Sequence, residues 1–304
     1  MTQERKDFLL LHFIVLIWGF TAILGLLISV SPVEVVFYRT AISAVALFFL
    51  LKFRKRNFHF SSPADLMKIL ATGVLIAAHW ILFFLSARIS NASVCLAGMA
   101  TCSLWTSLLE PLVKRKKIRG FEVLLSILAF AGIAIIFNVE FDYLAGLLIA
   151  VFSAFIASVF TIINGHYASK YNPYMITFYE MLGAAGCILV FYPVSLHYFS
   201  FLGLPMQPTI MDWIYLAILA VVCTVYAYSV SVELMKRLSA FSVNLVVNLE
   251  PVYGILLALI IFGSSEKMST GFYFGTLLIL SSVLMYPILN RRYKKRALLT
   301  DLIR

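Results

Sequence analysis

The sequence predicts an all-α membrane protein in which ten transmembrane helices form two inverted five-helix repeats around a central cavity. Of its 304 residues, 62% are hydrophobic and only 12% are charged, whereas soluble globular domains contain about 45–50% and about 25% of these types. The hydrophobic residues form blocks of about 20, the length that crosses a hydrocarbon core about 30 Å thick. The two halves of the chain also share residues at matching positions, which indicates an internal duplication.

Ten hydrophobic blocks are expected to cross the membrane. The block at 121–138 is short, and the block at 143–164 ends at the polar Asn164. The predicted spans cover residues 8–28, 33–52, 66–87, 92–113, 121–138, 143–164, 173–197, 211–235, 240–262 and 270–289.

The duplication is visible in two pairs of segments. The segment that begins at Arg88 shares Arg, Ser, Ser, Val and Leu with the segment that begins at Arg237, at an offset of 149. Pro, Phe and Tyr recur at an offset of 141 before Arg39 and Glu180. Because each half has five spans, the second half must enter the membrane with the opposite orientation. We expect a first repeat at 1–138, a second, inverted repeat at 143–290 and a basic cytoplasmic tail at 291–304.

The net charge of +10 is explained by orientation in the membrane and requires no nucleic-acid partner. With a cytoplasmic N-terminus, the connections that carry most of the Lys and Arg residues all lie on the cytoplasmic side, as the positive-inside rule requires. Both termini are then cytoplasmic, and the basic side chains meet anionic lipid headgroups. The four cysteines lie inside hydrophobic blocks without a CxxC pair, so we expect no metal site and no cofactor.

Polar and aromatic residues in the first half mark candidate cavity positions. Trp18 lies beside Gly19 in the first span, which also fits close helix packing. Arg39 lies about seven residues into the second span, where it faces the interior or extends to the interface. His79 and Phe83 share one face of the third span, and His79 is either a proton site or a hydrogen-bonded structural residue. The other candidates in this half are Trp80, Thr101 and Trp105.

The second half supplies candidates in its eighth and ninth spans. Tyr226 lies on one helical face with Ser229 and Glu233, and Tyr228 lies to the side of that face. Asn244 and Asn248 are four residues apart, so both amides are expected to line the cavity. Together with His79 and Trp80, these residues predict a pocket for a zwitterionic or heteroaromatic solute.

Three charged residues are candidates for gating or coupling. Arg39 and Glu180 lie at equivalent repeat positions, so we expect them at opposite gates of the transport path. Glu250 lies near mid-depth, where burial favours the neutral form of a carboxyl group, and Pro251 leaves the carbonyl of Val247 without a helical partner. Glu250 is therefore either the proton-coupling residue or a protonated partner of this kink.

These residues resemble the drug/metabolite transporter superfamily, specifically its ten-helix carriers with two EamA-type repeats. The resemblance rests on Phe37–Arg39, the Ser-rich segments at Ser90–Ser93 and Ser239–Ser242, and Glu250-Pro251. Lys114–Lys117 departs from it, because an acidic ending is typical there. The resemblance implies a cavity formed by spans 1, 3, 4, 6, 8 and 9, with spans 5 and 10 at the periphery.

The function implied by this resemblance is secondary active transport or exchange of a small metabolite across a prokaryotic inner membrane. The solute is expected to be an amino acid or a related compound, moved by efflux and alternating access, and Glu250 makes the proton the candidate coupling ion. No catalytic motif of the HExxH or GxSxG type occurs, so an enzyme is not expected. The alternative is a lipid-carrier flippase or a non-transporting partner subunit. The sequence leaves the oligomeric state open.

Overall fold

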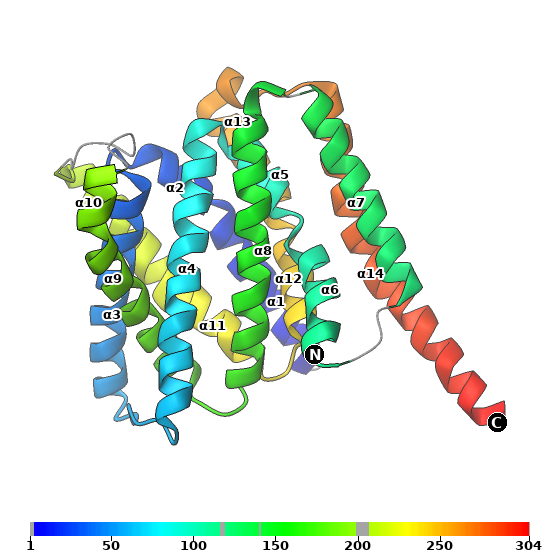
Figure 1. Cartoon of the computed structure of the whole chain (residues 1–304), viewed down its shortest axis with the longest axis horizontal. Coiled ribbons are helices and arrows are strands. Elements are labelled where there is room, and N and C mark those ends of the chain that lie inside the picture. Colours follow the sequence, from blue (N-terminus) through cyan, green and yellow to red (C-terminus); the bar gives the residue numbers. More distant parts are fainter. Residues whose placement is uncertain (1–2, 116–118, 140, 199–206, 304) are drawn as a thin grey trace.

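The computed structural model describes residues 3–115, 119–139, 141–198 and 207–303, and these residues form helices without a strand (Figure 1). Short connections join neighbouring helices into one bundle, and one helix pair lies beside it. The α-helices are α1 Gln3–Gly19, α2 Thr21–Leu27, α3 Pro32–Phe53, α4 Pro63–Ile89, α5 Ala92–Met99, α6 Cys102–Val113, α7 Gly120–Val139, α8 Leu144–Tyr167, α9 Pro173–Tyr198, α10 Ile210–Ala217, α11 Ala227–Leu234, α12 Ala240–Val247, α13 Glu250–Phe262 and α14 Thr270–Ile303.

Nine helices or helix pairs in the described part of the chain are long and apolar enough to cross a membrane. They correspond to all the predicted spans except 121–138. That block lies in α7, whose apolar segment Gly120–Ile136 is shorter than the other nine. The all-helical membrane fold is thus confirmed, while the count of ten spans and the inverted orientation of the repeats stay predictions.

Side-chain caps explain where several helices begin. Ser31 accepts a hydrogen bond from the backbone of Glu34, and the Glu34 side chain accepts one from the backbone of Ser31. This reciprocal capping box precedes Pro32, which fits the first turn because it has no N–H to satisfy. Asn91 and Ser239 cap α5 and α12 with a single hydrogen bond each, which the side chain accepts from a backbone N–H group of the first turn.

Three spans are interrupted near their middle. The first span breaks at Phe20 between α1 and α2, and the fourth breaks at Ala100 and Thr101 between α5 and α6. The ninth breaks at Asn248 and Leu249 between α12 and α13. The last two breaks lie at matching places in the two sequence repeats. Broken helices expose backbone and polar groups, which membrane proteins tolerate where those groups line a cavity.

The eighth span contains a π-helical segment, η3, at Ile218–Tyr226, between α10 and α11. A π-helix is wider than an α-helix because its hydrogen bonds join residues five apart. The backbone N–H of Ala227, directly after the segment, shows this spacing, since it donates to the carbonyl oxygen of Val222. The wider turn changes the direction in which the following side chains point.

Helices α7 and α14 form a pair at the side of the bundle (Figure 1). Their backbones approach closely at Gly132 and Gly275, where an added Cβ at Gly132 would lie 2.6 Å from the carbonyl oxygen of Gly275. Helix α14 continues to Ile303 and so runs through most of the predicted basic tail, whose cytoplasmic location stays a prediction.

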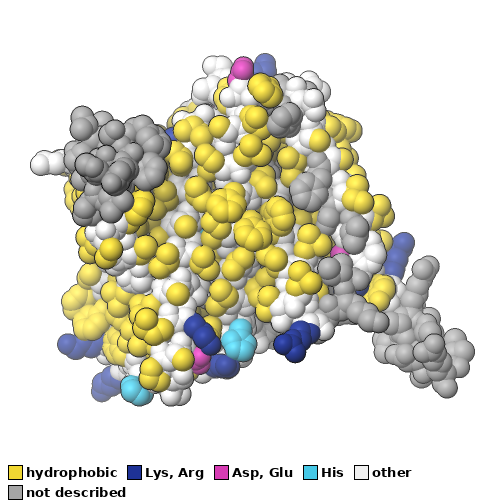
Figure 2. All heavy atoms as spheres, viewed as in Figure 1, with side chains coloured by type: hydrophobic (Ala, Val, Ile, Leu, Met, Phe, Trp, Pro, Cys, Tyr) yellow, Lys and Arg dark blue, Asp and Glu magenta, His cyan; other side chains and the backbone are white. Residues whose placement is uncertain are grey.

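One end of the bundle carries most of the basic residues, and α1 begins and α14 ends on this side (Figures 1 and 2). We call it the basic end. It is formed by the α3–α4, α8–α9 and α11–α12 connections, and the middle of the surface in Figure 2 is hydrophobic. We call the opposite end, which carries Arg88 and Lys267, the far end. The basic residues of the basic end include Arg54, Lys55, Arg56, Lys68, Lys114, Arg115, Lys170, Lys236 and Arg237.

Candidate functional site

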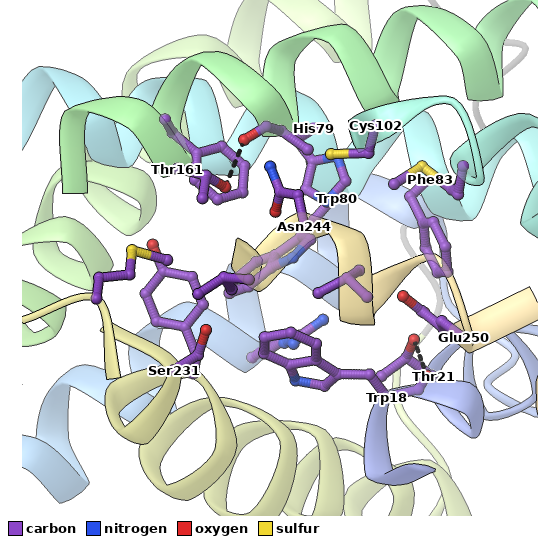
Figure 3. Close-up of a pocket in the computed structure, with 18 residues that line it drawn as sticks. Trp18, Thr21, His79, Trp80, Phe83, Cys102, Thr161, Ser231, Asn244 and Glu250 are labelled. Atoms are coloured by element: carbon purple, nitrogen blue, oxygen red, sulfur yellow. Dashed lines mark hydrogen bonds between the residues drawn. The ribbon is translucent and has the colours of Figure 1, made fainter. Parts of the chain in front are cut away.

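A cavity lies between the helices of the bundle (Figure 3). It contains about 720 Å³ of space free of protein atoms, a volume that includes open solvent at its mouth. Its lining consists of Trp18, Thr21, Arg39, His79, Trp80, Phe83, Met99, Cys102, Ala157, Phe160, Thr161, Tyr228, Ser231, Met235, Val243, Asn244, Val247 and Glu250.

The lining comes from spans 1, 3, 4, 6, 8 and 9, with Arg39 added from the second span. Each of the three broken spans contributes residues next to its break, such as Trp18, Cys102 and Glu250. Within the described residues, α7 and α14 contribute nothing to the lining. The arrangement is the one that the family resemblance implied, apart from Arg39.

Arg39 is the cation of the cavity, and its side chain is fixed on two sides. Its Nε donates a 2.8 Å hydrogen bond to Oγ1 of Thr224, whose own proton is directed to Leu219. Its guanidinium carbon lies 3.7 Å from the ring centroid of Trp80, which is a cation–π contact. The residue is 2% exposed and therefore does not extend to the membrane interface. The remaining N–H groups can face a solute.

The π-helical segment also positions Trp18. The indole Nε1 of Trp18 donates a 3.0 Å hydrogen bond to the carbonyl oxygen of Cys223. Cys223 and Thr224 are consecutive residues of η3, so this segment holds two lining residues from two other spans. π-Helical turns occur frequently at functional sites for this kind of reason.

Glu250 supplies a carboxyl group to the same cavity. It begins α13 directly after the break in the ninth span, beside Thr21 at the start of α2 (Figure 3). The ion pairs found among the described residues do not join Glu250 to Arg39. An acidic and a basic group therefore face one aromatic-lined space without neutralising each other in a direct contact.

Only one of the two predicted asparagines lines the cavity. Asn244 donates from Nδ2 to Oγ1 of Thr106 at 2.7 Å and presents its side chain to the cavity. Asn248 donates to Oγ of Ser103 at 2.6 Å and is 1% exposed, so it fastens the ninth span to α6. Both amides still point to α6, where Thr106 and Ser103 lie three residues apart, but only Asn244 belongs to the cavity lining.

His79 is hydrogen-bonded in a way that defines its neutral tautomer. The hydroxyl group of Ser153 donates to the carbonyl oxygen of His79 at 2.8 Å. The Ser153 hydroxyl oxygen lies 2.7 Å from Nδ1 of His79, and the Ser153 carbonyl oxygen lies 3.0 Å from the same nitrogen. Because the hydroxyl proton is directed elsewhere and a carbonyl oxygen only accepts, Nδ1 must be the donor. The neutral ring then presents Nε2 as an acceptor, and His79 belongs to the cavity lining.

The structure places Tyr228 in the cavity wall and Tyr226 outside it. Tyr226 is 40% exposed, whereas Tyr228 is 6% exposed and its ring lies 6.1 Å from that of Trp80. The expected face of the eighth span assumed regular α-helical spacing. The predicted residues Tyr226, Ser229 and Glu233 lie at and after the end of the π-helix, but the face of α11 that lines the cavity carries Tyr228 and Ser231 instead.

Two further candidates lie near the cavity without lining it. The Thr101 hydroxyl group donates to the carbonyl oxygen of Gly98 at 2.8 Å and stabilises the break in the fourth span. The Trp105 ring packs edge-on against Phe155, with centroids 5.4 Å apart. Phe83, by contrast, lines the cavity as expected.

Arg39 and Glu180 are separate, as the gate hypothesis requires, but neither forms an end of the path. Arg39 lies in the cavity wall. Glu180 lies behind the wall, where Tyr228 donates to its Oε2 at 3.1 Å. The ion pairs of the described chain do not include these two residues together. Their gating roles stay a hypothesis.

A second, larger cavity leads from the first towards the basic end. The two share Met235, and the second contains about 1930 Å³ of space free of protein atoms. Most of its wall is apolar, with Lys68, Lys114 and His166 among its polar residues. The central cavity thus borders open space on its basic side.

The far end is held by polar contacts between spans. Glu266 accepts hydrogen bonds from the backbone N–H groups of Ala92 and Ser93, both at 2.9 Å, at the start of α5. Arg88 donates to the carbonyl oxygens of Gly25 and Ile28, and Asp212 accepts from the backbone and side chain of Ser29. These contacts join the first, third, fourth, eighth and ninth spans.

Sequence reasoning named no candidate residue in α8, although the family resemblance implied that this sixth span lines the cavity. Phe160 and Thr161 line the cavity, and Ser153 and Asn164 hold residues in its wall or behind it. The polar residues Ser153, Thr161 and Asn164 recur at helical spacing in an apolar span, which is the signal that indicates an inward face.

Comparisons with known proteins agree with this geometry. A model of the EamA-like transporter family matches residues 6–138 and again residues 144–286. A relative from Archaeoglobus fulgidus described as an uncharacterized transporter is 24% identical over 194 residues, which cover 63% of this chain and 69% of the relative. A solved structure described as "Crystal structure of protein" matches with a TM-score of 0.69 at 16% identity. The match covers 95% of this chain and 99% of the chain in that structure. This last likeness shows the fold alone.

Proposed function

The chain belongs to the EamA-like transporter family, and from this premise we propose that it transports a small zwitterionic metabolite by secondary active transport. An amino acid or a related compound fits the cavity best. Arg39 binds the carboxylate of the solute, and Glu250 binds its ammonium group. Trp18, Trp80 and Tyr228 pack against the side chain. The observation that carries this proposal is that an acidic and a basic side chain line one aromatic cavity.

Alternating access is supported by the unequal ends of the path. The central cavity borders the large space at the basic end, while the far end is held by Glu266, Arg88 and Asp212. We infer that the second repeat is inverted and that the basic end is cytoplasmic in a prokaryotic inner membrane. The structure then corresponds to the inward-facing state, and efflux begins when a cytoplasmic solute enters.

Transport by purified protein in proteoliposomes tests the proposal. Vesicles are loaded with one unlabelled amino acid, nucleoside or organic cation, and uptake of the matching labelled compound is measured as counterflow. We expect counterflow for at least one zwitterion with an aromatic or apolar side chain, and loss of it in Arg39→Gln. Counterflow restricted to cations or uncharged nucleosides would overturn the assignment of Arg39.

The second cavity favours one alternative, a flippase for an amphipathic lipid carrier. Its apolar wall fits an acyl chain and its Lys68 and His166 side chains fit an anionic headgroup, while Lys114 is paired with Glu110 in the same wall. A fluorescent-lipid scrambling assay in the same vesicles separates the two functions. Scrambling without solute counterflow would support the flippase.

A further inference from the structure

Glu180 is a fully buried carboxyl group outside the substrate cavity. It is 0% exposed in α9 and meets Asn164 from α8 and Tyr228 from α11. The Tyr228 hydroxyl group donates to Oε2 of Glu180 at 3.1 Å. Nδ2 of Asn164 donates to the Tyr228 oxygen at 2.7 Å. Three spans therefore meet in one hydrogen-bonded triad.

With Glu180 ionised, the triad has too few donor hydrogens for its acceptor atoms. Tyr228 has a single hydroxyl proton, and it donates this proton in the hydrogen bond to Glu180. Oε1 of Glu180 and Oδ1 of Asn164 are both buried and have no hydrogen-bond partner within the described residues. Both atoms are acceptors when the carboxyl group is ionised. A proton on Oε1 of Glu180 turns one of them into a donor, so that it can bond to the other.

No cation neutralises Glu180 in the part of the chain that the structure describes. From α3, Arg39 is directed to Thr224 and Trp80, and from α4, His79 is bonded to Ser153. Helix α4 approaches the backbone of Glu180 at Gly73, which has no side chain, and α11 presents Tyr228. A buried carboxylate without a cation is costly, which favours binding of a proton.

Tyr228 connects this buried group to the cavity. Its ring lines the cavity and lies 6.1 Å from the Trp80 ring, which carries the Arg39 guanidinium at 3.7 Å. A carboxylate accepts a stronger hydrogen bond than a neutral carboxyl group does. The protonation state of Glu180 therefore sets how firmly Tyr228 is held in the cavity wall.

We propose that Glu180, with Asn164 and Tyr228, is the proton-binding site that couples transport to a proton gradient. This inference rests on the proposed function. A proton bound at Oε1 donates to Asn164, and its release to water on the open side leaves a carboxylate that keeps the Tyr228 hydrogen bond. Glu250, which the sequence marks for coupling, faces the solute directly and serves to bind it.

Infrared difference spectroscopy of the purified full-length protein tests proton binding without a solute. A pH change is applied, and the carbonyl stretch of protonated carboxyl groups is recorded. We expect one buried-carboxyl band in the wild type, its loss in Glu180→Gln and its retention in Glu250→Gln. Asn164→Leu removes the acceptor for the proton and should move the band to higher frequency. A band that is unchanged in Glu180→Gln overturns the proposal.

Two further outcomes are decisive. If replacing choline chloride with NaCl at constant pH abolishes the band, the site binds Na⁺ and the proton assignment is wrong. In proteoliposomes, Glu180→Gln should retain solute exchange and lose accumulation driven by a pH gradient. Retained pH-driven accumulation overturns the coupling role. A failure of the proposed function is recognised separately, because wild-type counterflow is then absent while the infrared band persists.

Discussion

Arg88 and Arg237, which lie 149 residues apart at matching positions of the two repeats, hold opposite ends of the same membrane span. Arg88 donates to the carbonyl oxygens of Gly25 and Ile28 at the end of α2. Arg237 forms two hydrogen bonds with the Asp7 carboxylate near the start of α1, at 2.7 and 2.8 Å. Asp7 also raises the pKa of Arg237, so this side chain stays charged. Each end of the first span is thus held by an arginine from a different repeat.

The Arg88 contacts predict which end of the cavity is closed. Cys102 lines the cavity and can report access to it when the other three cysteines are replaced by serine. We expect a membrane-impermeant maleimide to label Cys102 from the basic end only. Arg88→Gln removes hydrogen bonds from a charged donor, each worth about 1.5–3 kcal/mol, and should allow labelling from the far end as well.

Arg237→Gln is the matched control for this experiment, because it leaves the Arg88 contacts intact. Far-end labelling should stay at the background level in this variant. Equal far-end labelling in both variants would show that Arg88 does not close that end.

The geometry of Arg39 predicts that charge alone does not suffice for solute binding. Arg39→Lys keeps the cation but loses the planar contact with Trp80 and the Nε bond to Thr224. We expect the KM for counterflow to rise at least about tenfold, corresponding to about 1.4 kcal/mol of binding free energy. Thr224→Val removes only the acceptor and should have a smaller effect. A wild-type KM in Arg39→Lys contradicts the proposed carboxylate contact.

The two tyrosines of the eighth span should differ in their effect on transport. Tyr228→Ala removes part of the cavity wall, and we expect it to reduce the initial counterflow rate by about tenfold or more. Tyr226→Ala shortens an exposed side chain and should leave the rate within about twofold. The measurement is initial uptake at equal protein density in the vesicles. A reversed order of effects would place Tyr226 in the cavity.

Glu266 is predicted to stabilise the fold through the start of α5. Its carboxylate accepts two backbone hydrogen bonds where the positive end of the helix dipole lies. Glu266→Gln should reduce the free energy of unfolding by about 1–3 kcal/mol and lower the Tm in detergent. Ser265→Ala, next to it, removes only an exposed hydrogen bond to the carbonyl oxygen of Phe262 and should lower the Tm much less. Equal Tm values in the two variants would exclude this role.

Hydrophobic block length and repeated segments predicted most of the fold, because the bilayer imposes both. The residue types of the site were also predictable, since Arg39, His79 and Glu250 are costly in lipid and therefore face inward. The exact neighbours of these residues could not be predicted. Asn248 donates to Ser103 of α6 beside the break in the ninth span, and it does not line the cavity with Asn244. Such breaks depend on tertiary packing, which local sequence does not encode.

Glu110 shows a second limit of the repeat comparison. The first repeat lacks the acidic ending that Glu266 provides in the second. Glu110, in α6, makes the contact that corresponds to that of Glu266. It accepts a hydrogen bond from the backbone N–H of Phe241 at the start of α12. It also pairs with Lys114, as the adjacent basic run indicates. Matching positions in the sequence therefore do not identify all matching contacts.

The π-helical segment η3 gives the family member a simple route to a new solute preference. Deleting one residue within Ile218–Tyr226 would return the segment to α-helical spacing and close its wide turn. The Cys223 carbonyl group and the Thr224 hydroxyl group, which hold Trp18 and Arg39, would then lose their present positions. Descendants of such a chain could acquire a differently shaped pocket by one codon insertion or deletion, without any substitution of a lining residue.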